Sequence, residues 1–428
     1  MRKSVKVQII SRSILAENTS GNSAYILSFL RYLRQVGCEI EYILLDSSSN
    51  GRFPWYIIPS SLLKLAKVSA KNHLRIGRVL VRFNSVSDLL IETLRPVYDR
   101  LPITLKNIYR SGRDRQQQQP KYLTTSQSWD VPLTPEEIAF ANSRFEKFNP
   151  DVAIANYAFL GSILDSPFLN HSVLKVILTH DVRHQRSAGL KELGLVSFES
   201  DWSRERETQE LSKAQVLLAI QEEDAHLFKE MVPQSEVICL PMSVESHSHT
   251  VKQVTGRCLF VGSATDHNHY GLQWFLENVW PLIIQLIPDC SLHVCGTVCN
   301  FIQGTFPNVH LLGRVEDLKP EYSAASVCLV PLLAGSGLKI KLVEAMSYSR
   351  ACVSTSVGVQ GLREIVGKTT LVADTPEDFA MHVHTLLNNP DKRRWMEVQA
   401  DEFVTQKLSP QAVYQPFINY VYQYLHSG

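Results

Sequence analysis

The stretch from Pro331 to Gly361 decides the fold, and it reads PLLAGSGLKIKLVEAMSYSRACVSTSVGVQG. It follows the apolar run VCLV at residues 327–330, which predicts a short buried strand. Ala334 to Gly337 are all small residues and predict a turn that leaves room for a ligand. Beyond Lys339 apolar residues recur at helical spacing, so a helix is predicted to begin there.

A strand, a glycine turn and a helix N-terminus together make an anion site. The backbone N–H groups near Ser336 and Gly337 would point outward, where the helix dipole is positive. Lys339 and Lys341 add positive charge at the same end. Glu344, about one turn further on, is an acceptor for two neighbouring ribose hydroxyls. The stretch therefore predicts binding of a nucleoside diphosphate, although a Gly-Ser-Gly turn alone is more often only a turn.

The whole string resembles the donor-binding segment of the family 4 glycosyltransferases. That segment has a Pro-Leu pair, a glycine-rich turn, two basic residues and a Glu-Ala-Met sequence. Their counterparts here are Pro331-Leu332, Gly335-Ser336-Gly337, Lys339 with Lys341, and Glu344-Ala345-Met346. Many members carry a second glutamate where this chain has Ser336, and the usual glycine and proline after the helix are Ser349 and Ala351.

Length and composition indicate a two-domain globular protein. With 428 residues, 44% of them hydrophobic and 20% charged, two domains are expected. A net charge of +1 argues against a nucleic-acid partner. The sequence shows neither an apolar signal segment nor a run long enough to cross a bilayer, so a cytoplasmic location is expected.

The first half opens with a strand–helix–strand pattern. Residues 5–10 and 40–46 predict strands, and residues 24–36 predict the helix between them, as in a parallel-sheet unit. Gly21 lies in the turn before this helix and is the loose counterpart of the glycine loop that faces the substrate in the resembled family.

A second series of the same kind begins after a polar linker at residues 244–256. Its first strand ends at Gly262, which is predicted to belong to the donor site, and the turn that follows contains no Arg or Lys. The expected domains are residues 1–246, on the acceptor side, and 247–409, which bind the nucleotide sugar. Residues 410–428 form a final helix that crosses back to the first domain.

The pair His180-Asp181 follows a predicted strand at residues 173–179. Family 4 relatives often have a histidine at such a position near the donor sugar, so the resemblance makes His180 a catalytic candidate. Asp181 would orient His180 or cap the following segment.

Basic residues recur between Lys64 and Arg115, with apolar residues among them. Such a surface fits an anionic membrane or an acidic acceptor, which would place the protein peripherally on the inner membrane face. A solvated helix face is the alternative.

The alternating strands and helices predict an α/β chain with two facing Rossmann-like domains and a cleft between them, the GT-B architecture. The expected function is transfer of a sugar from a nucleotide sugar to a glycan, lipid-linked or small-molecule acceptor. The family resemblance implies retention of configuration, no essential metal and no further cofactor, and the sequence contains no Asp-x-Asp pair. A nucleotide-sugar epimerase of the same architecture and a non-catalytic partner subunit are the alternatives.

Overall fold

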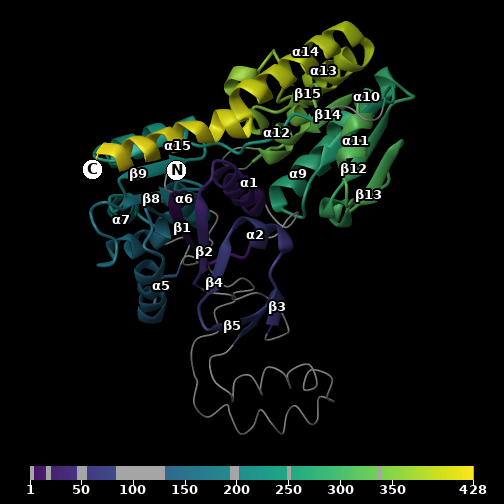
Figure 1. Cartoon of the computed structure of the whole chain (residues 1–428). Coiled ribbons are helices and arrows are strands. Elements are labelled where there is room, and N and C mark those ends of the chain that lie inside the picture. Colours follow the sequence, from purple (N-terminus) through teal and green to yellow (C-terminus); the bar gives the residue numbers. More distant parts are fainter. Residues whose placement is uncertain are drawn as a thin grey trace, which may run out of the picture. The chain divides into compact units, whose positions relative to one another are not determined.

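The computed structural model forms two compact units, and each has its own parallel sheet (Figure 1). The first unit comprises Met1–Leu218, Phe228–Ile238 and Tyr420–Gly428, and the second comprises Ala219–Leu227 and Cys239–Asn419. The residues that the structure describes are 4–15, 21–45, 55–82, 131–192, 202–247, 252–334 and 339–427.

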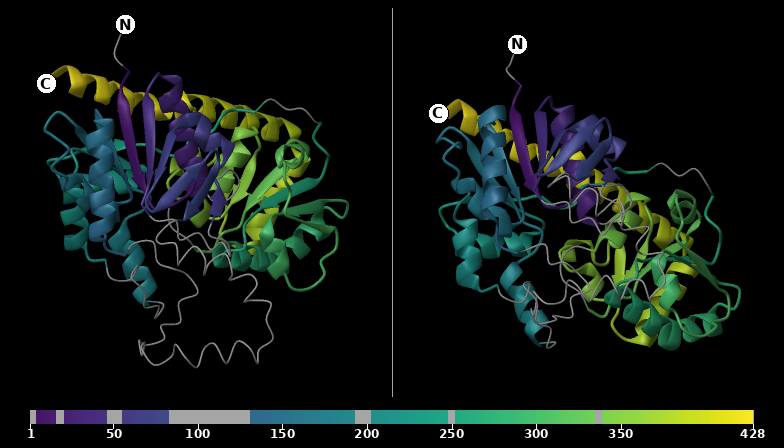
Figure 2. Two further views of the ribbon diagram at one scale, coloured as in Figure 1. Left: turned by 60° about the horizontal axis from the view of Figure 1, so that its bottom comes forward. Right: turned by 90° about the horizontal axis from the view of Figure 1, so that it is seen from below.

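The main sheet of the first unit has the strand order β10-β9-β8-β7-β1-β2-β4. The order reverses between β1 and β7, which are parallel neighbours. Figure 2 shows the purple strands of this sheet side by side. The strands are β1 (Lys6–Ser11), β2 (Glu39–Leu44), β4 (Lys67–Ala70), β7 (Val152–Asn156), β8 (Leu174–Leu178), β9 (Val216–Ala219) and β10 (Glu236–Cys239).

Short connections and helices join these strands. They are α1 (Gly21–Gln35), α2 (Ser60–Leu65), α5 (Pro135–Phe148), the 3₁₀ segment η1 (Ala158–Asp165), α6 (Arg183–Glu192), α7 (Arg204–Leu211) and α8 (Glu222–Met231). The start of α5 forms a capping box. The Thr134 hydroxyl accepts from the Glu137 backbone N–H, and the Glu137 carboxylate accepts from the Thr134 N–H.

Strands on either side of β4 in the chain form a small antiparallel sheet. It has the order β3 (Trp55–Ile57), β6 (Val79–Arg82) and β5 (His73–Ile76). The solvated-helix alternative is therefore wrong for residues 67–82, which form strands and turns. Residues 73–76 alternate polar and apolar side chains, as a strand with one apolar face does. The rest of the basic stretch, residues 83–115, lies outside the described residues.

The second unit contains a six-stranded sheet of order β13-β12-β11-β14-β15-β16. All neighbouring strands in this sheet are parallel, and the order reverses between β11 and β14. The strands are β11 (Arg257–Val261), β12 (Ser291–Cys295), β13 (Val309–Gly313), β14 (Val327–Val330), β15 (Cys352–Ser354) and β16 (Thr370–Val372).

Both faces of this sheet are covered, as a parallel sheet requires. Phe260 of β11 packs in one apolar cluster, whereas its neighbour Leu259 packs in another on the opposite face. The first cluster takes residues from α9 (Asp266–Trp274), η3 (Phe275–Val279), α10 (Trp280–Leu286), α13 (Pro376–Asn388) and α14 (Pro390–Phe403). The second takes residues from α11 (Lys319–Ala324), α12 (Ile340–Ser347) and η7 (Val404–Leu408). The prediction of an α/β chain with two Rossmann-like units is confirmed.

The last helix, α15 (Pro410–Ser427), is divided between the units: residues up to Asn419 belong to the second and those from Tyr420 onward to the first. Within the first unit, the Tyr424 hydroxyl donates to the His171 carbonyl at 3.1 Å. Among the described residues, no helix combines the length and hydropathy that a membrane span requires.

One buried carboxylate ties four elements of the first unit together. Glu41 of β2 is fully buried and accepts hydrogen bonds from Gln8 of β1 at 2.5 Å and Ser69 of β4 at 2.7 Å. It also forms an ion pair with Arg144 of α5. The network orders the centre of the sheet and holds α5 against it.

We expect Glu41→Gln to lower the free energy of unfolding by about 3 kcal/mol, because it removes the charge that compensates the Arg144 guanidinium. Urea unfolding followed by circular dichroism measures the change. Glu39→Gln, an exposed position on the same strand, is the matched control and should leave the midpoint unchanged. Equal midpoints for the two variants would contradict the prediction.

Candidate functional site

The lysines predicted to bind phosphate lie at the carboxyl end of β14, beside the reversal of strand order in the second unit. Lys339 is the N-cap residue of α12, and this confirms the predicted start of the helix. The carboxyl edge of a parallel sheet at such a reversal is where ligands bind in open α/β folds. Two further predicted site residues, Ser336 and Gly337, lie outside the described residues.

The Lys341 side chain is held over the first turn of the unit. Its ammonium group donates a hydrogen bond to Asn268 Oδ1 and lies 5.3 Å from the centre of the Phe260 ring. Asn268 is 4% exposed, and its Nδ2 donates to the Ser263 carbonyl at 3.0 Å. Asn268 thus links the turn after β11 to the start of α12.

Gly262 lies where β11 ends, next to this link. A Cβ atom at Gly262 would come within 2.7 Å of Phe260 Cε1 and 3.3 Å of Asn268 Cγ. Any larger residue would therefore displace the two side chains that surround Lys341. The role of Gly262 in this structure is to permit close packing.

Lys339 is also buried, with 7% of its surface exposed, and its ammonium group donates to Gln360 Oε1 at 3.3 Å. Burial lowers the pKa of Lys339 to about 8. Burial also lowers the pKa of Lys341 to about 8, with a further contribution from the Lys339 charge. Two buried ammonium groups that repel each other would be stabilised by an anion, and perturbed pKa values of this kind are typical of functional sites.

Glu344 lies about one turn further along α12. Its Oε2 accepts a hydrogen bond from the Tyr322 hydroxyl at 3.1 Å. Burial raises the pKa of Glu344, against the opposing effects of the Tyr322 hydrogen bond and the Lys341 charge. The Tyr322 ring is stacked on Tyr348 with 4.8 Å between centroids, and Tyr348 is stacked on His247 at 4.4 Å. This ring stack fixes the tyrosine that orients the carboxylate.

In the first unit, His180 follows β8 and lies among three side chains. Its ring is 4.0 Å from that of Tyr157 and 5.5 Å from that of Tyr25, centroid to centroid. His180 Nε2 is 2.8 Å from Asn156 Oδ1, while Asn156 Nδ2 donates to Ser11 Oγ at 2.9 Å. With its Oδ1 directed at the imidazole, Asn156 selects the tautomer that carries hydrogen on Nε2.

The other imidazole nitrogen is consequently an acceptor. His180 Nδ1 is buried and has no hydrogen-bond partner among the described residues. Burial lowers the pKa of His180 to about 3, so the ring is neutral at physiological pH. A neutral imidazole with an open acceptor is suited to accept a hydrogen bond from a hydroxyl group.

Asp181 points to arginines of the next helix. Its Oδ2 accepts from Arg186 at 2.9 Å, and its Oδ1 lies 3.6 Å from Arg183. The first N–H groups of α6 donate instead to the buried Glu207, from Arg183 at 2.9 Å and from His184 at 2.8 Å. Glu207 is thus the carboxylate at the N-terminus of this helix.

Gly21 is the first residue of α1, and its neighbour Asn22 donates through Nδ2 to the Tyr157 hydroxyl. Because Tyr157 also contacts His180, the start of α1 and the end of β8 belong to one cluster. Tyr157 has φ 89°, a backbone conformation that is costly for a residue with a side chain and is found mainly at functional sites.

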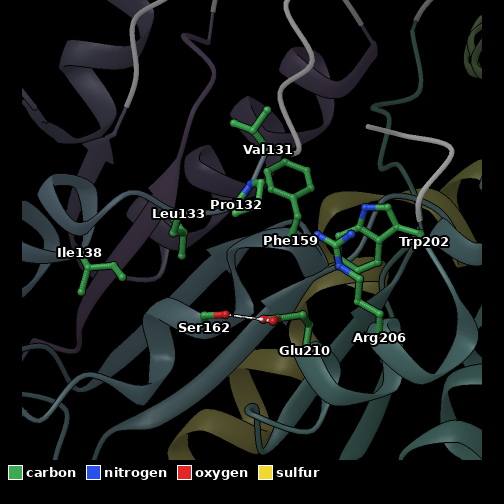
Figure 3. A pocket seen from close by; sticks show the side chains of 9 residues that line it. All are labelled: Val131, Pro132, Leu133, Ile138, Phe159, Ser162, Trp202, Arg206 and Glu210. Atoms are coloured by element: carbon green, nitrogen blue, oxygen red, sulfur yellow. Dashed lines mark hydrogen bonds between the residues drawn. The ribbon is translucent and has the colours of Figure 1, made fainter. Parts of the chain in front are cut away.

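A hollow of about 230 Å³ lies next to this cluster in the first unit (Figure 3). Phe159, which is stacked on Tyr157 with 5.0 Å between centroids, forms part of its wall. Arg206 lies 4.5 Å from the ring centre of Trp202, and Ser162 donates to Glu210 at 2.8 and 2.9 Å. The full lining is Val131, Pro132, Leu133, Ile138, Phe159, Ser162, Trp202, Arg206 and Glu210.

Sequence reasoning missed Asn268, Tyr322, Asn156 and Tyr157. The one local signal was the Asn-Tyr pair directly after the buried residues of β7, because polar side chains at that strand end face the ligand edge of a parallel sheet. Among the described residues, no group of three or more His, Cys, Asp or Glu is arranged to hold a metal ion.

The low pKa of His180 predicts acid sensitivity. Because the folded pKa of about 3 lies below the unfolded value, His180 contributes stability above about pH 6.5 that is lost as the pH falls. When the pH is lowered from 7 to 5, the shifted pKa of His180 alone should decrease the free energy of unfolding by about 2 kcal/mol. His180→Gln should reduce that loss in urea unfolding, and the exposed His226→Gln should not. An identical pH dependence in wild type and His180→Gln would contradict the prediction.

Comparison with known proteins agrees with the fold. Residues 255–389 match the family model of group 1 glycosyl transferases. An uncharacterized 44.6 kDa protein in the cps region of Klebsiella pneumoniae is 27% identical over 168 residues, which are 36% of this chain and 43% of that protein. The matched part is thus less than half of that relative.

Solved structures cover nearly the whole chain at low identity. Sucrose-phosphate synthase from Thermosynechococcus elongatus is 14% identical with a TM-score of 0.59, over 99% of this chain and 100% of that one. S. aureus TarM, a mutant in complex with fondaparinux, α-GlcNAc-glycerol and UDP, is 10% identical with a TM-score of 0.63, over 97% and 99%. Anabaena HepE in complex with UDP is 10% identical with a TM-score of 0.59, over 98% and 100%. The chain therefore has the fold of the GT-B glycosyltransferases, and residues 255–389 of its second unit are similar to the group 1 glycosyl transferases.

Proposed function

We propose that this protein is a glycosyltransferase that takes its sugar from a nucleoside diphosphate sugar. The observation that carries the proposal is the pair of lysines at the start of α12, whose pKa values are lowered by burial, with Glu344 one turn further on. The pair supplies positive charge for a diphosphate, and the carboxylate supplies an acceptor for ribose hydroxyls.

Lys339 and Lys341 would bind the phosphates together with the N–H groups at the start of α12. An anion there relieves the repulsion between the two ammonium groups and compensates for their burial. The lysines would also stabilise the leaving diphosphate, which is the task of a metal ion in other phosphate sites. This supports the proposal of metal-independent transfer.

Glu344 would bind the ribose through Oε1, since Oε2 already accepts from Tyr322. TarM and HepE have each been solved with UDP, and we propose a uridine nucleotide as the first donor to test.

His180 is proposed to accept a hydrogen bond at Nδ1 from a hydroxyl of the transferred sugar. Its neutral state allows it to do so without repelling positive charge that develops at the anomeric carbon. We propose transfer with retention, in which the leaving diphosphate removes the proton from the incoming acceptor hydroxyl. Asp181 would keep Arg183 and Arg186 in place beside the cluster.

The acceptor is proposed to be a sugar, free or in a glycan or lipid-linked. The hollow next to Phe159 offers apolar walls, the Arg206 guanidinium and the Glu210 carboxylate, which suit the mixed surface of a carbohydrate.

The donor site can be tested by calorimetry with UDP. Glu344→Ala should weaken binding by about 1.5–3 kcal/mol, the usual loss for hydrogen bonds to a charged acceptor. Lys341→Ala should weaken binding as well and should reduce its dependence on salt. The exposed residues Glu364 and Lys368 of the same unit provide the controls Glu364→Ala and Lys368→Ala. Unchanged affinity in both site variants would show that the donor site lies elsewhere.

The catalytic role of His180 is tested by turnover. His180→Ala should keep its affinity for UDP and lose kcat by about a hundredfold, the usual effect of one positioned group. His226→Ala is the control. Proton NMR of the product should show the anomeric configuration of the donor. Full activity of His180→Ala would remove this residue from the mechanism, and an inverted product would exclude retention.

A further inference from the structure

The small antiparallel sheet of the first unit exposes large apolar side chains. Exposed fractions are 44% for Trp55, 63% for Ile57, 58% for Leu74 and 62% for Ile76. In a folded protein single exposed apolar residues are common, but a contiguous group usually marks an interaction site.

The strand register places these residues on one face. Val81 is paired with both Trp55 and Leu74, and Val79 is paired with both Ile57 and Ile76. Directly opposed residues in antiparallel strands point to the same side of the sheet. We call the resulting surface the apolar face; it consists of Trp55, Ile57, Leu74, Ile76, Val79 and Val81.

The opposite face of the sheet is occupied. Leu80, which is paired with Tyr56 and Arg75, is 1% exposed. The centre of this face is therefore covered at Leu80, whereas the apolar side is exposed. In Figure 1 the sheet is found by the labels β3 and β5, and β6 lies between these two strands in the strand order.

All charged residues in the segment that forms the apolar face are Lys or Arg. Between residues 55 and 82 there is neither Asp nor Glu, although the whole chain has a net charge of only +1. Arg78 lies in the turn between β5 and β6, and Lys71 lies in the turn before β5. The six cations of this segment are Lys64, Lys67, Lys71, Arg75, Arg78 and Arg82.

We propose that the apolar face docks on an anionic lipid bilayer. The apolar side chains would enter the boundary between headgroups and acyl chains, where Trp55 is favoured as an interfacial residue. The surrounding Lys and Arg side chains would contact anionic headgroups. The contact is shallow, because the unpaired edges of an open sheet are not tolerated deeper in the hydrocarbon.

The positive charge of this segment favours an anionic bilayer over a second copy of the chain as the partner of the apolar face. A symmetric dimer through the apolar face would place the same basic segment of both copies together. Like charges at close range oppose such an interface, whereas anionic lipids neutralise them.

The experiment is co-sedimentation of the full-length protein with vesicles of phosphatidylcholine, with and without phosphatidylglycerol. We expect binding to the anionic vesicles only, and weaker binding at higher salt. The double variants Leu74→Ser/Ile76→Ser and Lys71→Glu/Arg78→Glu should each lower the partition coefficient by about tenfold or more. Leu311→Ser/Leu312→Ser and Arg363→Glu/Lys368→Glu, at exposed positions of the second unit, are the matched controls and should bind like wild type.

A second readout follows the indole of Trp55. Its emission should shift to the blue on anionic vesicles and be quenched by brominated acyl chains, and Trp55→Phe should remove this response. The UDP affinity of each variant, measured in parallel, shows that the protein is folded and keeps the lipid result independent of the proposed transferase activity.

Three outcomes would overturn the proposal. The first is equal binding of the wild-type protein to neutral and anionic vesicles. The second is unchanged vesicle binding by both double variants. The third is a wild-type protein that does not bind vesicles but forms a dimer in sedimentation velocity, while Leu74→Ser/Ile76→Ser stays monomeric. The last of these would assign the apolar face to an interface between copies.

Discussion

The second unit depends on the repulsion between two ammonium groups that are both out of water. Lys339 and Lys341 lie at the start of α12, beyond the end of β14. What keeps Lys341 in place is neutral: an amide oxygen from Asn268 and the face of Phe260. Withdrawing an ammonium group from water is unfavourable, and burial accordingly lowers the pKa of both lysines. The arrangement makes sense as one half of an interaction whose other half is an anion.

The first unit also contains features that are unfavourable in the protein alone, and here they involve uncharged polar groups. The Tyr157 backbone adopts a strained φ, and the His180 imidazole keeps an acceptor without a partner among the described residues. Both features cost free energy in the protein alone. They are maintained because Asn156, Ser11 and Asn22 hold the surrounding side chains in fixed positions.

Local patterns in the sequence were sufficient for the fold and for the residues of α12. The start of this helix and the capping box at Thr134 depend on neighbours within one turn, so they can be predicted without tertiary information. Asn268 and Tyr322 could not be predicted. They meet Lys341 and Glu344 across 73 and 22 residues of sequence, and only the parallel order of β11 and β14 brings them together. In the basic segment a solvated helix was one alternative, whereas residues 73–76 and 79–82 form strands, and only the first of these shows polar and apolar residues in alternation.

The depressed pKa values of Lys339 and Lys341 make anion binding a proton-coupled event. With a pKa of about 8, each ammonium group is partly neutral in mildly alkaline solution. A bound anion favours the charged form, so the protein must take up protons from the buffer when the ligand arrives and release them when it leaves. The heat of binding would then vary with the ionisation enthalpy of the buffer, and affinity would fall as the pH rises through the pKa of the free lysines. A cell that becomes more alkaline would thus loosen the protein's hold on its anionic ligand without any change in the amount of either.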